Sequence, residues 1–185
     1  PPLGGELDNR LIPKSVSASH QNGTNESASK ANDQDTTTKW CVTSGQSQTP
    51  WLQYALRDTA IVERCMVLGA ARESGHYVAR SFKLQYQAAD GTWVDADVVE
   101  DNQMNKVIRT LSQPITATRV RLQMIQGEQT EYTTRIYEFA VYGWLKGEDP
   151  DGMDKVQCVA DEEPWYDLGG RKIAYGGVKN GVYVQ

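Results

Sequence analysis

The sequence has few of the residues and motifs that catalysis usually requires. Its 185 residues include only two histidines, His20 and His76, and neither lies in a recognisable catalytic motif. No GxSxG, HExxH or glycine-rich phosphate motif is present. Acidic residues gather between Asp95 and Asp101, but alternating acids on a strand edge usually form a solvated rim that prevents edge pairing. The sequence therefore favours a binding or structural domain over an enzyme.

The chain also lacks a basic excess and a membrane-spanning segment. Its net charge is -5 and its pI about 5.1, which argues against nucleic acid and against an anionic membrane surface as the main partner. No apolar run approaches the roughly 20 residues of a transmembrane helix. No signal peptide is visible and the chain opens on Pro1-Pro2, so we expect a fragment of a longer protein.

Cysteine is scarce, and its count is odd. Cys41, Cys65 and Cys158 leave at least one thiol free, and no CxxC or Cys/His spacing indicates a zinc site. Cys41 and Cys65 lie in apolar surroundings, so we expect both to be small core residues. A disulfide between these two is an open alternative. Cysteine usage does not determine the compartment.

The hydrophobic pattern predicts an all-β fold. Val, Thr and Tyr are abundant, and apolar and polar residues alternate in several short segments. Asp90-Gly91 predicts a hairpin turn. About eight strands without a convincing helix predict a sandwich or a barrel; they are expected at 14–20, 51–56, 61–68, 82–86, 93–99, 106–111, 120–124 and 136–142. The predicted core includes Phe82, Leu84, Tyr86, Trp93, Val120, Leu122, Phe139 and Val141.

One polar loop, residues 31–40, has the composition of a hard-cation site. Asp33 and Asp35 can each offer a carboxylate and Thr38 a hydroxyl, which are oxygen ligands of the kind that calcium takes. The alternative is that these side chains only make turns within the loop. Far along the chain, Glu138 is a single acid in an apolar strand. A buried carboxylate needs a partner or a shifted pKa, and a bound cation would be such a partner.

These two segments and five others resemble one family in order. The other five are Lys14–Ser19, Pro50–Leu56, Phe82–Tyr86, Asp90–Trp93 and Ala117–Leu122. From about Asn9 to Trp144 the chain resembles the discoidin domain, the C-type domain of coagulation factors V and VIII, and the bacterial family 32 carbohydrate-binding modules. The resemblance implies a jelly-roll β-sandwich whose first and last strands meet. Glu138 would then lie beside the Asp33 loop.

The resemblance also implies ligands for this domain. It implies a structural calcium ion held by Asp33, Asp35, Thr38 and Glu138. One departure lies in this loop, because the family usually has glycine at the position of Gln34. The family-level function is carbohydrate binding by an accessory domain of a secreted glycoside hydrolase, with the catalytic domain of the parent chain as its partner.

Polar and aromatic residues in three predicted loops are candidates for contact with a sugar. An aromatic ring can cover the C–H face of a sugar, while arginine and histidine donate to its hydroxyls. The wider set contains His20, Asn22, Asn25, Arg72, Glu73, His76, Tyr77, Arg80, Glu128, Tyr132 and Arg135. From it we select His20, Arg72, His76 and Tyr132 as the predicted contacts for a terminal galactose-like or N-acetylated hexosamine residue.

The chain divides into three expected parts. Residues 1–8 are a lead-in, residues 9–146 the sandwich, and residues 147–185 an acidic linker with a β-rich tail. The tail contains Tyr166-Asp167-Leu168 and Gly181-Val182-Tyr183, and it resembles C-terminal tails of secreted proteins from anaerobic Gram-negative bacteria. We therefore expect a secreted, periplasmic or outer-surface location.

Two other functions stay open. The domain could be a structural or protein-interaction domain that packs on a neighbouring catalytic domain and binds no sugar. A role at phospholipid membranes or cell surfaces, as in animal relatives, ranks last, because such domains insert apolar loop tips and the loops here are polar.

Overall fold

The computed structural model describes residues 9–129 and 131–148. This part contains one short 3-10 helix, η1 (Ala28–Ala31), and seven strands. The strands are β1 (Ser15–Ala18), β2 (Trp40–Val42), β3 (Trp51–Gly69), β4 (Ser81–Gln87), β5 (Trp93–Val99), β6 (Lys106–Gln126) and β7 (Thr134–Leu145). The fold is all-β, as the alternation predicts.

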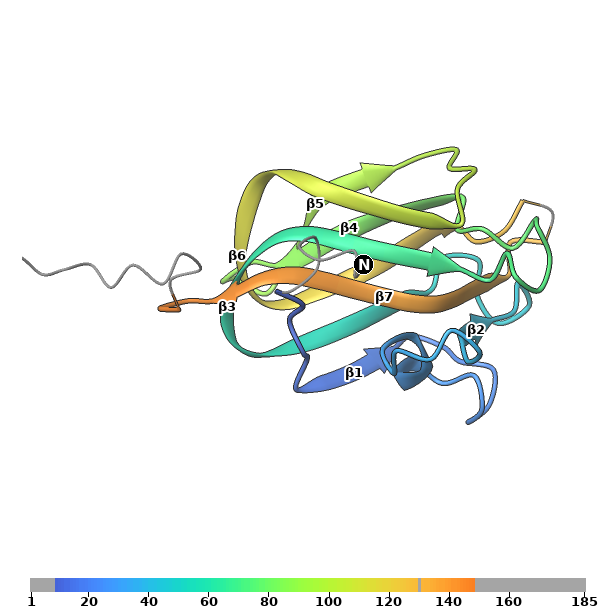
Figure 1. Ribbon diagram of the computed structural model, residues 1–185, viewed down its shortest axis with the longest axis horizontal. Helices are drawn as coiled ribbons and strands as arrows, with labels where there is room; N and C mark the ends of the chain where they lie inside the picture. Colours follow the sequence, from blue (N-terminus) through green and yellow to red (C-terminus); the bar gives the residue numbers. More distant parts are fainter. Residues whose placement is uncertain (1–8, 130, 149–185) are drawn as a thin grey trace, which may run out of the picture. The chain divides into compact units, whose positions relative to one another are not determined.

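Two long strands, β3 and β6, take part in both layers of the sandwich (Figure 1). The first half of β3 pairs with β1 and with the second half of β6, which continues to β4 and the edge strand β5. The second half of β3 pairs with β7, which continues to β2. Register shifts between Ala55 and Ala60 mark the bend in β3.

This continuity corrects the strand boundaries expected from the sequence. The predicted strands at 51–56 and 61–68 are the two halves of β3, and those at 106–111 and 120–124 lie within β6. Residues Arg57 to Ala60 have the composition of a turn, but the backbone there is extended and belongs to β3. The short strand β2 was not predicted. Asp90-Gly91 does form a hairpin turn, with a φ of 85° at Gly91.

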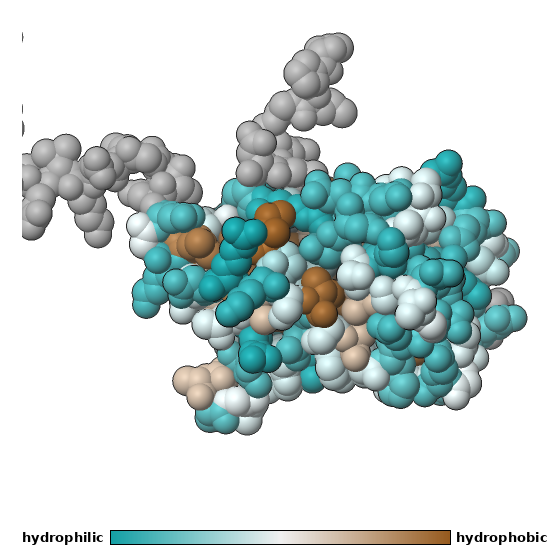
Figure 2. Space-filling model, turned by 90° about the horizontal axis from the view of Figure 1, so that it is seen from below, coloured by the Kyte–Doolittle hydropathy of each residue, from teal (hydrophilic) through white to brown (hydrophobic). Residues whose placement is uncertain are grey.

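The core lies between the two layers. Six of the eight predicted core residues are buried, namely Phe82, Leu84, Val120, Leu122, Phe139 and Val141. Tyr86 is half-buried and packs against the core. The prediction for Trp93 was wrong, because this half-buried residue pairs with Gln87 on the outer face of its sheet. On the face in Figure 2, hydrophobic residues form small separate groups among hydrophilic ones.

The resemblance implied that the first strand meets the last strand. In the structure, the segment before β1 makes this contact with β7. In the described residues β1 pairs with β3, not with β7. Instead, the backbone of Arg10 forms an isolated antiparallel β-bridge with Tyr142 of β7, and the Leu11 N–H donates to the Val141 carbonyl at 2.9 Å. The described domain therefore begins before its first strand.

Cys41 and Cys65 are buried free thiols, so the open alternative of a disulfide between them is excluded. Burial is the main cause that raises the pKa of each thiol to about 12. The third cysteine, Cys158, and the predicted tail lie outside the described residues, as does the lead-in 1–8. Among the residues that are described, no helix has the length and hydrophobicity to span a membrane.

Candidate functional site

The Asp33 loop is an internally hydrogen-bonded turn that buried neighbours hold in place. Before it, Ala31 is buried, and its carbonyl accepts a hydrogen bond from the Tyr54 hydroxyl at 3.2 Å. After it, Trp40 is fully buried, and its indole N–H donates to the His20 carbonyl at 2.9 Å. The polar loop is thus fixed at both ends by aromatic side chains of the core.

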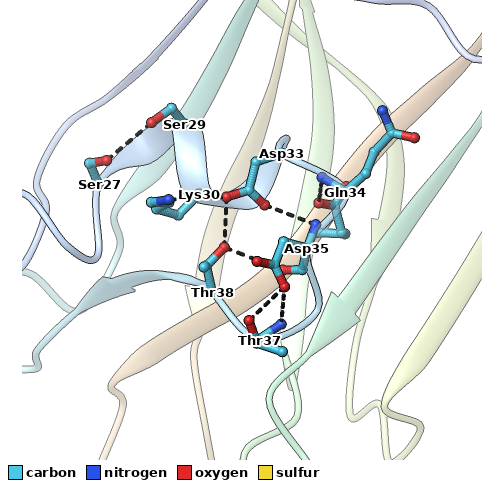
Figure 3. Close-up of polar contacts among 9 residues, drawn as sticks. Ser27, Ser29, Lys30, Asp33, Gln34, Asp35, Thr37 and Thr38 are labelled. Atoms are coloured by element: carbon cyan, nitrogen blue, oxygen red, sulfur yellow. Dashed lines mark hydrogen bonds and ion pairs between the residues drawn. The ribbon is translucent and has the colours of Figure 1, made fainter.

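Within the loop, three oxygens lie close together (Figure 3). The Thr38 hydroxyl lies 2.7 Å from Asp33 Oδ2 and 3.3 Å from the Asp35 carbonyl oxygen. The Asp33 carboxylate also accepts from the Asp35 N–H at 3.1 Å and from Lys30 at 3.3 Å. The carboxylate of Asp35 is not one of these three oxygens, because it accepts hydrogen bonds from the hydroxyl and the N–H of Thr37 instead. These bonds lower the pKa of Asp35.

Glu138 on β7 reaches this loop, as the resemblance implied. Its Oε1 accepts the Gln34 N–H at 2.6 Å, and its Oε2 lies 2.7 Å from the Arg10 guanidinium. Burial raises the pKa of Glu138, whereas Arg10 and the Gln34 N–H oppose the rise. The lone acid therefore has a cationic partner within the chain. Gln34 has a φ of 61°, so this position does need the left-handed conformation that glycine adopts most easily.

The oxygen atoms of the Asp33 loop are of the kinds that a hard cation binds, but their arrangement fits such a site less well. The Asp33 carboxylate, Thr38 hydroxyl and Asp35 carbonyl are the mixed oxygen set that calcium takes. Across the described part of the chain, however, no three acidic, histidine or cysteine side chains converge on one point. Asp35 would contribute its carbonyl instead of its carboxylate. The carboxylate of Glu138 would have to be shared with Arg10.

The loops meet at one end of the sandwich, on the right in Figure 1. Charged side chains join them there. Lys39, just before β2, lies 3.1 Å from Glu26 of the first loop and 2.9 Å from Glu73 of the central loop. The Tyr137 hydroxyl donates to Glu73 at 2.9 Å. A further backbone bond from the Arg80 N–H to the Gly127 carbonyl, 2.8 Å, links the central and last loops. Three loops distant in sequence thus form one surface.

The four predicted sugar contacts, His20, Arg72, His76 and Tyr132, are all exposed, and they come from the three joined loops. No hydrogen bond or ion pair connects their side chains with one another in the part of the chain described. They share one end of the domain, but they do not form a closed pocket by contact with each other. Their donors and the Tyr132 ring are left available to solvent.

The last loop holds Tyr132 in an unusual backbone conformation. Its φ is 57° and its side chain is 43% exposed. The left-handed region is costly for an aromatic residue, by about 1–2 kcal/mol. The loop is closed by a hydrogen bond from the Glu128 N–H to the Thr133 carbonyl at 3.0 Å. A Cβ at Gly127 would lie 2.4 Å from that carbonyl oxygen, so glycine is required there.

Several other candidates from the wider set already pair with side chains of the protein. Arg135 forms a 2.6 Å ion pair with the buried Glu128, and its guanidinium lies 3.9 Å from the ring centre of Tyr77. Asn22 donates to Glu26 at 2.6 Å. Glu73 pairs with Lys39 as described above. These residues shape the loop end and are less free to bind a ligand.

Sequence reasoning missed four residues of the two sites: Arg10, Glu26, Lys39 and Tyr137. Arg10 lies beside a proline-rich lead-in, and nothing in its neighbourhood indicates a partner 128 positions away. Lys39 and Tyr137 adjoin apolar segments and read as ordinary strand residues. One signal for these residues was present in the sequence, the single acid Glu138 in an apolar strand. That signal required a partner for the carboxylate but did not identify the residue.

Comparison with known proteins agrees with this fold. The family model of the F5/8 type C domain matches residues 15–139. None of the curated proteins compared with the chain matches it.

Solved structures of similar fold are family 32 carbohydrate-binding modules. The module from Streptococcus pneumoniae EndoD superposes with a TM-score of 0.63 at 24% identity, over 72% of this chain and 99% of that one. The module from C. perfringens NanJ in complex with galactose gives 0.59 at 20%, over 72% and 98%. CpGH89CBM32-5 from Clostridium perfringens, in complex with GalNAc-β-1,3-galactose, gives 0.61 at 13%, over 70% and 94%.

The described residues therefore form a jelly-roll β-sandwich with a polar loop end and an acidic loop tied to its last strand. The chain belongs to the F5/8 type C domain family.

Proposed function

We propose that this domain is a non-catalytic carbohydrate-binding module that binds a terminal sugar residue at its loop end, as an accessory domain of a secreted glycoside hydrolase. The observation that carries the proposal is the exposure of His20, Arg72, His76 and Tyr132 on three loops, which the Lys39–Glu73 ion pair and the backbone bond from Arg80 to Gly127 link. Family membership and the sugars named for the neighbouring modules add support.

The chemistry of these side chains suits a galactose-like or N-acetylated hexosamine residue. Arg72 and the two histidines can donate to axial or vicinal hydroxyls, and the exposed ring of Tyr132 can cover the C–H face of the sugar. The strained backbone of Tyr132 is consistent with a binding role, since such strain often gathers at ligand sites. Few ligand atoms would be engaged, so we expect dissociation constants between about micromolar and millimolar.

Isothermal titration with galactose and N-acetylgalactosamine, after a glycan array, tests the site. Arg72→Ala should abolish binding and leave the melting temperature unchanged, because an exposed loop arginine contributes little to stability. Arg57→Ala, an exposed arginine in the bend of β3, is the matched control and should bind as the parent does. Absence of sugar binding in the parent, or full binding by Arg72→Ala, would favour the structural-domain alternative.

We further propose that a structural calcium ion stabilises the Asp33 loop. Asp33, Thr38 and the carbonyl of Asp35 would hold it, and Glu138 would complete the site from β7. Its role would be to fasten the loop to the last strand, and bound ion would stabilise the fold by mass action.

The domain should melt at a higher temperature in calcium than in chelator. Asp33→Asn should remove that difference, whereas Asp58→Asn, an exposed acid in the β3 bend, should retain it. Equal melting of the parent in calcium and in chelator would refute the site.

A further inference from the structure

The outer face of the five-stranded layer carries a set of side chains that the loop site does not use. Across β1, β3, β6, β4 and β5, the register aligns one residue from each strand on this face: Ser17, Gln53, Arg121, Gln85 and Asp95. With strands about 4.8 Å apart, this row is about 19 Å long. The neighbouring rows add Arg119 and Lys83, together with the indoles of Trp51 and Trp93. The face is therefore polar and carries two aromatic rings.

The centre of the row is an arginine without an acidic partner. The guanidinium carbon of Arg121 lies 4.2 Å from the ring centre of Trp93, and Nε donates to the amide oxygen of Gln85 at 2.7 Å. No ion pair of Arg121 exists among the described residues, and its remaining nitrogens have no hydrogen-bond acceptor there. Partial burial lowers its pKa, with Asp95 acting in the opposite direction. Arg121 is thus a half-buried, oriented cation whose outer nitrogens are free to donate.

The only acid in the row is already satisfied. Asp95 Oδ2 lies 2.7 Å from the ammonium of Lys83, and Oδ1 accepts from the Gln85 amide at 2.5 Å. Arg119, which lies opposite Ala55 on the same face, is exposed and has no ion-pair partner among the described residues. Arg119 and Arg121 therefore leave an uncompensated positive charge on this face. A ligand that complements it must be anionic, extended and rich in hydroxyl groups that can bond to amides such as Gln53.

We propose that this face, centred on Arg121, binds an extended anionic polysaccharide at a site separate from the loop end. The free edge of the Arg121 guanidinium would make paired hydrogen bonds to a uronate carboxylate or a sulfate ester, which planar guanidinium groups recognise well. The amide of Gln53 would bond to ring hydroxyls, and Trp51 would offer an aromatic surface to a neighbouring sugar unit. The shared chemistry is an anionic group on a sugar chain, and the test separates the two anions.

Affinity electrophoresis of the 185-residue chain tests this site, with polygalacturonate as the carboxylate probe, dextran sulfate as the sulfate probe and dextran as the neutral control. We expect retardation by at least one anionic polymer and none by dextran. Arg121→Gln should weaken that interaction about tenfold or more, because a charge-assisted bidentate contact is lost. Arg119→Gln, which does not touch Trp93, should weaken it less and tests the face even if Arg121→Gln folds poorly. Arg57→Gln makes the same change of charge in the β3 bend and should leave the affinity within about twofold.

The proposal for the sheet face and the proposal for the loop end can be refuted separately. If the Arg72→Ala variant still binds the anionic polymer, and excess galactose does not displace that polymer, the polymer site is separate from the loop end. The inference then stands even if the domain binds no terminal sugar. The polymer that is retained identifies the anion. The inference is overturned if neither anionic polymer binds the parent, if galactose displaces the polymer, or if Arg57→Gln weakens binding as much as Arg121→Gln, which would indicate only general charge attraction.

Discussion

Arg10 and Glu138 form a 2.7 Å ion pair across 128 positions of sequence, with the glutamate side chain 4% and the arginine side chain 17% exposed. This pair joins the chain before the first strand to the last strand, next to the Asp33 loop. It also supplies the positive charge that a lone buried carboxylate requires.

Arg10→Gln should therefore destabilise the domain by about 2–3 kcal/mol, because it leaves a buried carboxylate without its cation. Urea unfolding followed by tryptophan fluorescence measures the change. Lys30→Gln is the matched control, since the Lys30–Asp33 pair is longer at 3.3 Å and more exposed, and its loss should cost less than about 1 kcal/mol. Equal losses in the two variants would mean that the Arg10–Glu138 pair contributes no more than a surface contact.

Gln34→Gly should stabilise the domain by about 0.5–1 kcal/mol. The φ of 61° strains a residue with a Cβ, the side chain is exposed, and the backbone N–H that donates to Glu138 is retained. Gln48→Gly in the next loop should have the opposite effect, because it only adds freedom to the unfolded chain. Thermal melting of both variants checks the prediction. A lower melting temperature for Gln34→Gly would show that its side chain matters more than its backbone.

Gly143→Ala should disrupt folding, with a loss of at least about 3 kcal/mol. A Cβ at this position would lie 1.8 Å from the backbone oxygen of Ile61 on the paired strand β3, and backbone cannot move aside as a flexible side chain can. Gly45→Ala, which meets nothing within 4 Å, should be nearly neutral. Soluble yield and urea midpoint are the measurements. A Gly143→Ala protein with the parent's midpoint would mean that β3 and β7 separate without cost.

Cys41 and Cys65 should resist thiol reagents in the folded protein. Their pKa values of about 12 leave roughly one thiolate in ten thousand at pH 8, and burial blocks access. Titration with Ellman's reagent should detect at most one thiol natively and three in denaturant. In a Cys158→Ser variant the native protein should show none and the denatured protein two. Fast native reaction in that variant would indicate that the sandwich opens.

The sequence by itself determined the class of fold and most of the core. Phe82, Leu84, Val120 and Leu122 alternate with polar residues, and a period of two places them on one face of a sheet wherever their strands pair. The ordered motifs also led to the closeness of Glu138 and the Asp33 loop. Both inferences depend on local patterns, or on a resemblance that local patterns carry.

Tertiary structure alone decided which polar groups meet. Trp93 has the hydrophobicity of a core residue, yet it lies on the outer face under Arg121, because the register of β5 against β4 sets its direction. Arg10 became the partner of Glu138 because the lead-in runs beside β7. Such pairings depend on the positions of strands distant in sequence, and no period along a single segment encodes them.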